Sequence, residues 1–456
     1  MTTRTRWGRW LALVLAIVFV AAACSGGGRE DTSSDSGDSS SDTSGGGEDA
    51  GPLTIDTASC TGSPTQGVTD TSIKFGTSVP QSGLFAAFSK IAEGYNAYFD
   101  FLNSEEGGVD GREVSVEVTD DGYESGQTVS NVQQLVQQDQ VFGIFNVVGT
   151  PNNLAIRDTL NQDCVPQLYA ATGAALWGNP DEFPFTIGSL PTYATEMGVF
   201  VDYLKENSPE AKVAILFQND DFGQEYVDSF ETLTEGTDIT VVTEESYEPS
   251  DSDVDSQITS IANSGADTVV LAATALKCPQ ALDALQAQSG FDPETVWLSQ
   301  TCTSSTVIGL SSPGAAEGVL SAIYLKDPAD PQWDDDPAMV EFQEQGQAHG
   351  LSAEQVEDGV VGIGWTFGQL LAETIRNAGQ DITRESIMQA AYSLDGLEVG
   401  LLLPGVTFTT NGAEDPFPIE TLQIGQYNGD FWDFVGDPID LEGQSGQFTP
   451  ASEQGN

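Results

Sequence analysis

The segment Lys212-Val-Ala-Ile-Leu-Phe-Gln-Asn-Asp-Asp-Phe-Gly223 joins an apolar run to a polar turn. An uninterrupted apolar run is typical of a strand buried on both faces of a parallel sheet, so residues 212–217 predict such a strand. Residues 223–233 predict the helix that follows, and residues 238–247 predict the next strand. A strand, a helix and a second strand in this order are the unit from which parallel α/β sheets are built.

The same alternation extends on both sides of this unit. In a first block we predict strands at residues 72–78, 113–119, 141–148 and 166–170, and helices at residues 86–103, 126–138 and 152–161. In a second block we predict further helices at residues 193–207, 253–264 and 279–288, and further strands at residues 267–272 and 295–299. Because each block has the size of one domain, the sequence predicts an α/β protein with two doubly wound parallel-sheet lobes.

The C-terminal region is less regular than these two blocks. Ser352 and Gln355 have the spacing of a capping box at the start of a predicted helix over residues 352–377. A further helix is predicted at residues 384–393, and residues 406–434 predict short strands and turns. This region is too small and irregular for a third independent domain, so we expect it to complete the first two.

The N-terminus has the features of an export signal. Arginines within residues 1–9 precede an apolar stretch at residues 11–20, and Ala21-Ala-Ala-Cys24 places small residues before a cysteine. This pattern predicts a secretory signal peptide over residues 1–23. It also resembles a bacterial lipobox, in which Cys24 is lipidated and becomes the new N-terminus. An ordinary cleaved signal followed by a chance cysteine is the alternative.

A tether is predicted to follow the lipidated cysteine. Residues 25–51 consist almost wholly of Ser, Gly, Asp and Glu, and they contain no apolar periodicity. Such a composition cannot offset the conformational entropy that ordering would cost, so residues 24–51 predict a disordered linker. A lipid, a flexible linker and then folded lobes describe a protein displayed just outside a membrane.

Four cysteines remain after cleavage of the signal, and an even number in an exported chain favours two disulfides. The sequence allows three pairings. We favour Cys278–Cys302, because both residues should follow the carboxyl ends of consecutive parallel strands, and Cys60–Cys164 then follows by elimination. Free buried thiols are the alternative.

Charge and composition exclude several classes of function. The 456 residues include 14 Lys and Arg against 70 Asp and Glu, which gives a formal net charge of −56. A surface this acidic repels phosphate backbones, so we expect no nucleic-acid partner. The single histidine, His349, cannot supply a multi-histidine zinc site, and no Cys/His spacing indicates a metal. The dispersed acidity fits a protein that works in high salt, where self-repulsion is screened.

Binding residues are expected in the loops that follow the strands, because ligands bind beyond the carboxyl ends of parallel strands. The loop over residues 149–153 runs into a helix, whose N-terminus attracts a carboxylate. It has no P-loop lysine and no dinucleotide fingerprint. Asp220 and Asp221 are adjacent acids, which we interpret as solvated loop residues rather than an acid–base pair. No catalytic motif is present, so we expect no enzyme; ordinary turns between strands and helices are the alternative interpretation of these loops.

Several motifs in this order resemble one family. They are Thr77-Ser-Val-Pro-Gln-Ser-Gly83, Val147-Val-Gly-Thr-Pro-Asn-Asn-Leu-Ala155, Val165-Pro-Gln-Leu-Tyr-Ala-Ala-Thr-Gly173, Phe217-Gln-Asn-Asp-Asp-Phe-Gly223, Tyr324-Leu-Lys-Asp-Pro328 and Leu402-Leu-Pro-Gly405. From Val68 to Gly436 the chain resembles the type I periplasmic binding proteins, and specifically the leucine/isoleucine/valine-binding family of ABC transporter lipoproteins.

The resemblance implies two α/β lobes that three crossover strands join, with a ligand cleft between them. The crossings are expected near Gly188–Leu190, Tyr324–Asp327 and Ile419–Gln423. This places lobe 1 at residues 52–189 plus 326–421 and lobe 2 at residues 190–325 plus 422–442, and it leaves residues 443–456 as a disordered tail.

The resemblance also implies the residues that contact the ligand. Gly149, Thr150, Ala170 and Thr172 match the positions that hold an α-carboxylate, with the Ala170 carbonyl also accepting from the ligand's ammonium. Aromatic residues of both lobes line the pocket, and here these are Phe85 or Phe88 and then Phe222. The remaining expected ligand contacts come from other loops that follow strands, and they are Ser82, Thr274 and Thr301.

This chain departs from the family where an acid usually pairs with the ammonium of an amino acid. Gln300, Thr301 or Cys302 occupies that position, and family members also often have a serine where Gly149 stands. A buried ammonium without a partner is costly. Amides and small carboxylic acids are therefore alternatives to a branched-chain amino acid as ligand. Asp220 or Asp221 is the other possible source of the missing charge.

The resemblance thus implies the solute-binding subunit of an ABC importer. We expect a monomer without cofactor or metal, anchored through its lipid to the outer face of the bacterial membrane and delivering its solute to an ABC permease. A ligand-sensing surface lipoprotein that presents its closed form to a signalling partner is the alternative.

Overall fold

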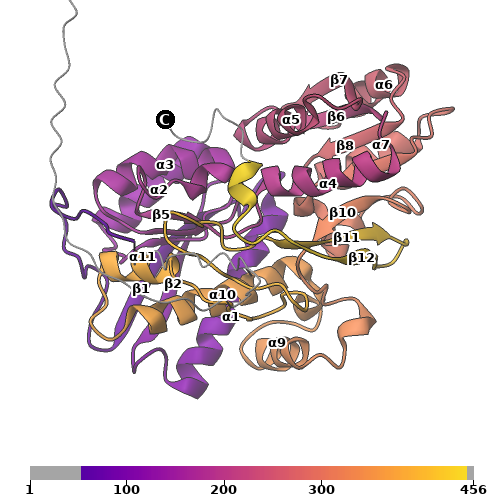
Figure 1. Cartoon of the computed structure of the whole chain (residues 1–456). Helices are drawn as coiled ribbons and strands as arrows, with labels where there is room; N and C mark the ends of the chain where they lie inside the picture. The colour runs from indigo at the N-terminus through magenta and orange to yellow at the C-terminus, as the bar shows by residue number, and fades with distance from the viewer. Residues whose placement is uncertain (1–52, 449–456) are drawn as a thin grey trace, which may run out of the picture. The chain divides into compact units, whose positions relative to one another are not determined.

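Two β-sheets organise residues 53–448, the part of the chain that the computed structural model describes (Figure 1). The predicted signal peptide, the lipidated Cys24 and the tether lie outside these residues. The first sheet is parallel throughout and has the order β2-β1-β3-β4-β5. Its strands are β1 (Ser72–Val79), β2 (Glu113–Asp120), β3 (Ile144–Phe145), β4 (Gln167–Ala170) and β5 (Thr186–Gly188).

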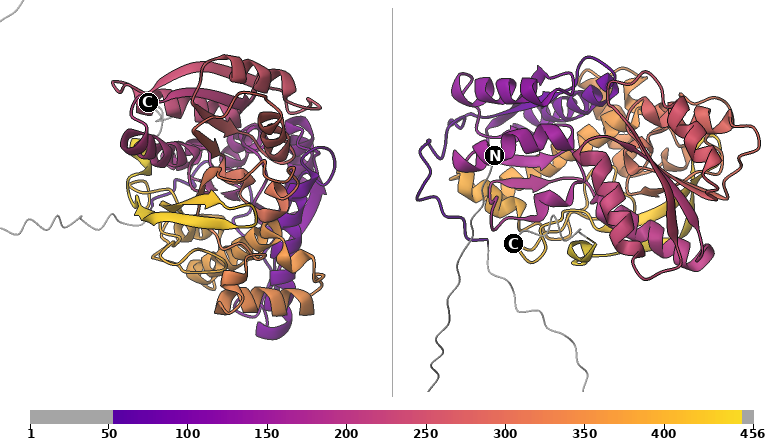
Figure 2. Two further views of the ribbon diagram at one scale, coloured as in Figure 1. Left: turned by 90° about the vertical axis from the view of Figure 1, so that its right-hand side faces the viewer. Right: turned by 90° about the horizontal axis from the view of Figure 1, so that it is seen from above.

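The second sheet has seven strands in the order β12-β11-β10-β9-β8-β6-β7. They are β6 (Lys212–Gln218), β7 (Thr240–Tyr247), β8 (Thr268–Ala272), β9 (Thr295–Leu298), β10 (Leu320–Ile323), β11 (Thr421–Tyr427) and β12 (Trp432–Asp440). The strands from β7 to β10 are parallel, whereas β11 and β12 pair antiparallel at the edge. This C-terminal hairpin lies beside strands that precede it by about a hundred residues (Figure 2).

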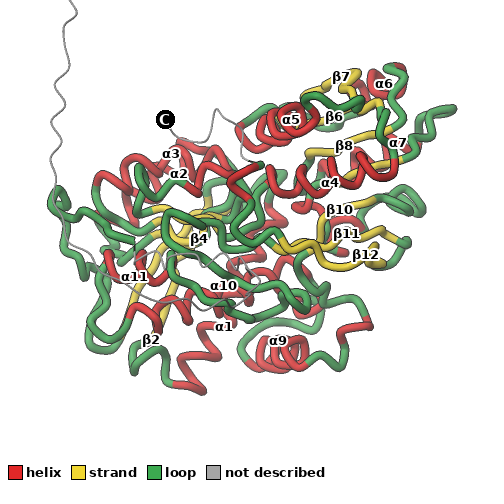
Figure 3. Tube along the Cα trace, viewed as in Figure 1, coloured by secondary structure: helices red, strands yellow, loops and turns green. Residues whose placement is uncertain are grey.

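Helices cover both faces of each sheet (Figures 1 and 3). Those of the first sheet are α1 (Lys90–Phe101), α2 (Ser125–Gln137), α3 (Thr150–Gln162), α10 (Gly359–Ala378) and α11 (Arg384–Ala391). Those of the second are α4 (Tyr193–Asn207), α5 (Asp221–Thr234), α6 (Asp255–Asn263) and α7 (Lys277–Gln286). The helices α8 (Ser305–Ile308) and α9 (Pro337–Ala348) lie in connections. None of the helices in the described part of the chain is both long and apolar enough to cross a membrane.

Single helical turns complete the secondary structure. The 3₁₀ turns are η1 (Ala86–Ser89), η3 (Ala175–Gly178), η4 (Gln300–Cys302), η5 (Pro331–Trp333), η6 (Gln355–Glu357) and η7 (Ser445–Gln447), and η2 (Leu102–Glu106) is a π-helical turn.

The chain passes between the two sheets three times, after β5, after β10 and before β11. The two predicted α/β lobes with parallel sheets and three connecting segments are therefore confirmed. The C-terminal region does return to complete both lobes, because α10 packs against α1 and α11 against α10, while β11 and β12 extend the second sheet.

Four features of the structure differ from the sequence predictions. The predicted strand over residues 141–148 shortens to β3, because Asn146 has a φ of +54° and its side chain donates to the Tyr169 carbonyl at 2.8 Å. Ser352 and Gln355 do form the reciprocal capping bonds, but these begin only η6. The long helix starts at Gly359, where extended Asp358 accepts from the Val360 N–H.

The other two differences concern α9 and the end of the chain. The helix α9 has no counterpart among the predicted elements; Asp336 caps it, accepting from Ala338 and Met339. Residue 443 does not begin a disordered tail. The Glu420 carboxylate accepts from the N–H groups of Gly443 at 2.6 Å and Ser445 at 2.7 Å, which fixes η7.

Both predicted disulfides are present, so the pairing is confirmed and the free-thiol alternative is wrong. Cys60 bonds to Cys164 with a Cα–Cα distance of 5.5 Å, and Cys278 bonds to Cys302 with one of 5.8 Å. The second bridge joins the start of α7 to η4, which follow the neighbouring strands β8 and β9. It therefore ties together two loops at the carboxyl edge of the second sheet.

The helices α1 and α10 meet through their backbones rather than through side chains. A Cβ atom added to Gly94 would lie 2.0 Å from the Val361 carbonyl oxygen, and one added to Gly364 would lie 2.0 Å from the Ile91 carbonyl oxygen. Glycine is thus required at both positions. The resulting close approach joins the C-terminal region to the first lobe.

We predict that Gly94→Ala or Gly364→Ala lowers the free energy of unfolding by roughly 1–3 kcal/mol, because the helices must separate to admit a methyl group. Urea denaturation measures this change. The matched control is Gly126→Ala on α2, where an added Cβ meets nothing within 4 Å. That variant should be unchanged or up to about 1 kcal/mol more stable, since alanine favours helix. Equal effects at Gly94 and Gly126 would contradict the close packing.

Candidate functional site

A cleft lies where loops of the two sheets meet. The loops that follow β2, β3 and β4 contribute to it from the first sheet, and those that follow β6, β8 and β9 contribute from the second. The residues that line it are Phe88, Ile91, Tyr123, Val148, Gly149, Thr150, Ala171, Leu190, Tyr193, Phe222, Thr274, Gln300, Thr301, Thr303, Ser304, Tyr324, Val360 and Ile363. The position agrees with the expectation that ligands bind beyond the carboxyl ends of parallel strands.

The structure places six of the ten predicted ligand contacts on this cleft, and they are Phe88, Gly149, Thr150, Phe222, Thr274 and Thr301. Two others lie directly behind its wall. The Thr172 hydroxyl is 2.5 Å from that of Thr150, and the Phe85 ring stacks on Tyr123 with centroids 3.9 Å apart. Both residues therefore support the lining rather than form it.

The remaining two predicted contacts, Ser82 and Ala170, do not line the cleft. Ser82 is exposed and hydrogen-bonds to Asp120. Ala170 is buried, and its neighbour Ala171 lines the cleft instead. Side chains alternate between the two faces of a strand, so the shift from Ala170 to Ala171 changes which methyl group faces the cleft.

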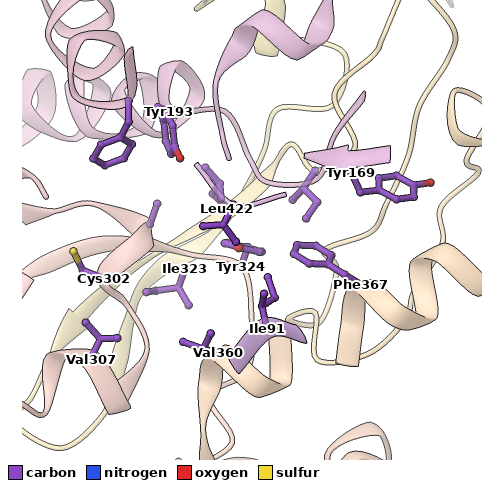
Figure 4. Close-up of a cluster of buried hydrophobic side chains, with 14 of the residues drawn as sticks. Ile91, Tyr169, Tyr193, Cys302, Val307, Ile323, Tyr324, Val360, Phe367 and Leu422 are labelled. Atoms are coloured by element: carbon purple, nitrogen blue, oxygen red, sulfur yellow. The ribbon is translucent and has the colours of Figure 1, made fainter. Parts of the chain in front are cut away.

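Three tyrosines that sequence reasoning missed are prominent in the lining. Tyr193 begins α4, and Tyr324 follows β10, so both lie on segments that connect the sheets. Figure 4 shows these two side chains within one buried cluster that also contains Ile91 and Val360. Tyr123 follows β2, and applying the strand-end rule to residues 120–123 would have found it.

Tyr123 explains why glycine stands at position 149. Gly149 has a φ of +99°, and a Cβ atom there would lie 2.6 Å from the Tyr123 ring. The ring therefore occupies the space that the side chain of a serine would need. Tyr123 also hydrogen-bonds to the Gln218 side chain, so it links the loop after β2 with the end of β6.

The N-terminus of α3 is held in place by a chain of hydroxyl groups. The Thr172 hydroxyl lies between those of Thr150, at 2.5 Å, and Tyr193, at 3.3 Å. The Asn153 amide donates to the carbonyls of Val147 at 2.8 Å and Gly149 at 2.9 Å, which fixes the turn into the helix. A helix N-terminus with adjacent hydroxyls suits a carboxylate.

No residue that lines the cleft carries a full charge. The described lining contains no Asp, Glu, Lys, Arg or His. Its ionisable groups are tyrosines, and burial raises the pKa of Tyr193 and Tyr324 well above the ordinary value, so both are neutral at physiological pH. The wall is thus polar through hydroxyl and amide groups and apolar elsewhere.

Glu196 on α4 is a fully buried acid close behind this wall. Its carboxyl group accepts from the Tyr226 hydroxyl at 2.6 Å, the Trp297 indole at 2.9 Å and the Gln300 N–H at 3.1 Å. Burial raises the pKa of Glu196 to about 7 despite these donors. The network fixes Gln300, which lines the cleft.

Asp220 and Asp221 are not part of the cleft lining. Asp220 caps α5, where its carboxylate accepts from the N–H groups of Phe222 at 3.1 Å and Gly223 at 3.3 Å and from the Gln218 amide at 2.6 Å. Asp221 is exposed. The hydrogen bond from the Phe222 N–H to Asp220 orients Phe222. The Phe222 ring lines the cleft and meets the Tyr193 ring edge to face.

Within residues 53–448, one acidic cluster has the spacing of a cation site. Oxygens of Asp415, Glu420 and Glu442 all lie within 4.8 Å of one another. Glu420 already accepts from two backbone N–H groups. Burial and the neighbouring Glu420 raise the pKa of Asp415 to about 8, so a proton on Asp415 accounts for the close approach. The cluster lies away from the cleft lining.

Comparison with known proteins identifies relatives of this architecture. The family model described as "Periplasmic binding protein" matches residues 72–430. The Leu/Ile/Val-binding protein homolog 3 of Brucella melitensis is 28% identical over 199 residues, which is 43% of this chain and 53% of that protein. Homolog 7 of Brucella suis is 24% identical over 208 residues, or 43% of this chain and 51% of that protein. The chain thus spans about half the length of the curated relatives it matches.

Solved structures share the fold at low sequence identity. A branched-chain amino acid ABC transporter protein from Thermus thermophilus with bound valine superposes with a TM-score of 0.72 and 18% identity, covering 82% of this chain and 97% of that one. A fatty acid ABC transporter substrate-binding protein from Thermomonospora curvata superposes with a TM-score of 0.68 and 20% identity. The match covers 84% of this chain and 96% of that one. One fold therefore serves proteins named for quite different solutes.

The raised pKa of Glu196 leads to a pH prediction. A carboxyl group with a folded-state pKa of about 7 and an ordinary value of 4.5 stabilises the fold most below pH 4.5, and this contribution is lost as the pH rises through 7. We expect the stability advantage of the wild type over Glu196→Gln to shrink across this range. Denaturation at several pH values measures the difference in the free energy of unfolding between the two proteins. The control is Glu206→Gln, which changes an exposed acid on the same helix. A difference independent of pH would show that Glu196 is already ionised throughout.

Proposed function

Because the chain belongs to the periplasmic binding protein family, we propose that it is the extracytoplasmic solute-binding subunit of an ABC importer. The observation that carries this proposal is the cleft itself, which loops of both sheets line with a neutral, partly apolar wall and a helix N-terminus. A branched-chain amino acid or a related small carboxylate or amide fits such a site. The names of the Brucella relatives and the valine-bound structure support the same class of ligand.

Capture would follow from the positions of the lining residues. In lobe 1, which we propose comprises residues 52–189 and 326–421, Thr150 and the first turn of α3 bind the ligand's carboxylate. Phe222, Thr274 and Thr301 approach from lobe 2, residues 190–325 and 422–442. Binding at both walls favours a closed arrangement of the lobes, with the three connecting segments as the hinge. The ligand is held and released without chemical change.

Delivery would depend on the N-terminal segment. Cleavage before Cys24 and lipidation of that residue would anchor the protein to the outer face of the cell membrane. The linker over residues 24–51 would let the lobes reach an ABC permease. Both the lipid and the permease partner belong to this proposal.

A ligand screen tests the proposed function. The purified protein is heated with amino acids, amides and small carboxylic acids at about 1 mM and at several salt concentrations. A ligand with a Kd near 1 μM should add about 4 kcal/mol of stability, which gives a clear rise in Tm. X-ray scattering with that ligand should show a smaller radius of gyration. The absence of any stabilising solute, together with unchanged scattering, would contradict the proposal.

We further predict that Thr150→Val weakens binding of the identified carboxylate by about tenfold or more, since a hydrogen bond to a charged group contributes roughly 1.5–3 kcal/mol. Isothermal titration calorimetry measures the Kd. The control is Ser82→Ala, an exposed position away from the cleft lining, which should leave the Kd unchanged. If the two variants bind alike, the carboxylate is not held at α3.

A further inference from the structure

An amino acid would bring a positive ammonium group into the cleft, where no described lining residue offers an anion. A charge taken out of water without a partner is strongly unfavourable. The sequence lacks the acid at Gln300–Cys302, and no acid belongs to the described lining.

The acids nearest to the wall are already engaged. Glu196 accepts from three donors of its own lobe, and Asp220 uses both carboxylate oxygens to cap α5 and hold Gln218. Glu225, a buried acid on α5, accepts from the Ala175 N–H at 2.9 Å. None of the three belongs to the lining, and turning one toward a ligand would leave buried donors without acceptors.

A smaller cavity next to the cleft also provides no free charge. It shares Thr303, Ser304, Tyr324 and Ile363 with the cleft, and its lining includes Lys326 and Asp327. Asp327 accepts from the N–H and hydroxyl of Ser305, at 2.9 and 3.0 Å, and from the Ala329 N–H at 3.0 Å. Lys326 pairs with Asp336 at 2.8 Å.

The backbone carbonyl expected to accept from an ammonium is occupied as well. The Ala170 oxygen accepts from the Thr172 N–H at 2.8 Å and from the N–H and hydroxyl of Ser189, at 3.2 and 3.0 Å. A carbonyl oxygen has two lone pairs, so three donors saturate it. An ammonium group would therefore find no acid in the lining, and the Ala170 carbonyl would not be free to accept from it.

What the cleft does offer fits a different ligand. The Thr150 hydroxyl and the N-terminus of α3 suit a carboxylate, while Phe88, Ile91 and Val360 suit an apolar body. Gln300 lines the other wall, and its side-chain oxygen is buried without a hydrogen-bond partner among the described residues. Its amide nitrogen donates to the Pro191 carbonyl at 2.9 Å. A neutral acceptor of this kind suits a hydroxyl group better than an ammonium.

We propose that the ligand is an apolar carboxylic acid without an ammonium group, such as an alkanoate or a 2-hydroxyalkanoate. This inference rests on the proposed function, because it names the ligand class of the same cleft.

Matched pairs of ligands test the inference. Calorimetry on the purified protein compares leucine with 4-methylpentanoate, valine with 3-methylbutanoate and phenylalanine with 3-phenylpropanoate, and it includes 2-hydroxy-4-methylpentanoate and 4-methylpentanamide. We expect the acid without an amino group to bind at least tenfold more tightly than its amino-acid partner in each pair that binds.

Three results would overturn the inference in distinguishable ways. Tighter binding of an amino acid than of its partner would refute the absence of the ammonium and leave the proposed function standing. Binding of the amide but of no acid would refute the carboxylate. If no solute of this set or of the wider screen binds, the inference and the proposed function both fail.

A charge placed in the wall provides the second test. We expect Gln300→Glu, and independently Thr301→Asp, to change relative affinity within each ligand pair. The Kd of the amino acid, divided by the Kd of the matching acid without an amino group, should fall at least tenfold. The ratio cancels a general loss of affinity, and circular dichroism checks the fold. Since the two variants alter different side chains, an unchanged ratio in both would contradict the idea that the missing anion excludes an ammonium.

Discussion

One buried carboxyl group connects four elements on one side of the cleft. Glu196 lies on α4, directly after the first crossing, and it accepts from α5 through Tyr226, from β9 through Trp297 and from η4 through Gln300. A carboxyl group without such donors would be costly in this position. The loop that presents Gln300 therefore has its geometry set by the interior of lobe 2 rather than by the ligand.

The alternation of strands and helices in the two blocks could be predicted from sequence, because it follows from local periodicity. The helix α4 has the predicted bounds for the same reason. The Cys278–Cys302 pair could be predicted because it joins segments after neighbouring strands, and Cys60–Cys164 then followed by elimination. The true start of α10 was missed, since one extended residue, Asp358, interrupts an otherwise helical pattern.

The site was predicted less completely than the fold. Loops after strands supplied most of the lining, and the same rule applied to the loop after β2 would have added Tyr123. The packing of the Tyr123 ring against the Gly149 backbone, in contrast, is visible only in the structure. Ser82 lies in the correct loop but faces solvent. Such contacts join residues far apart in sequence, and their side-chain directions depend on backbone angles that composition does not determine.

The bridge between Cys278 and Cys302 has a consequence for binding. It holds η4, and with it Gln300 and Thr301, against α7 before any ligand arrives. A wall that is already rigid spends little entropy when a solute docks, so more of the contact energy appears as affinity. The same rigidity makes this wall a template of fixed outline, and solutes of different size must be accommodated by the aliphatic side chains opposite it.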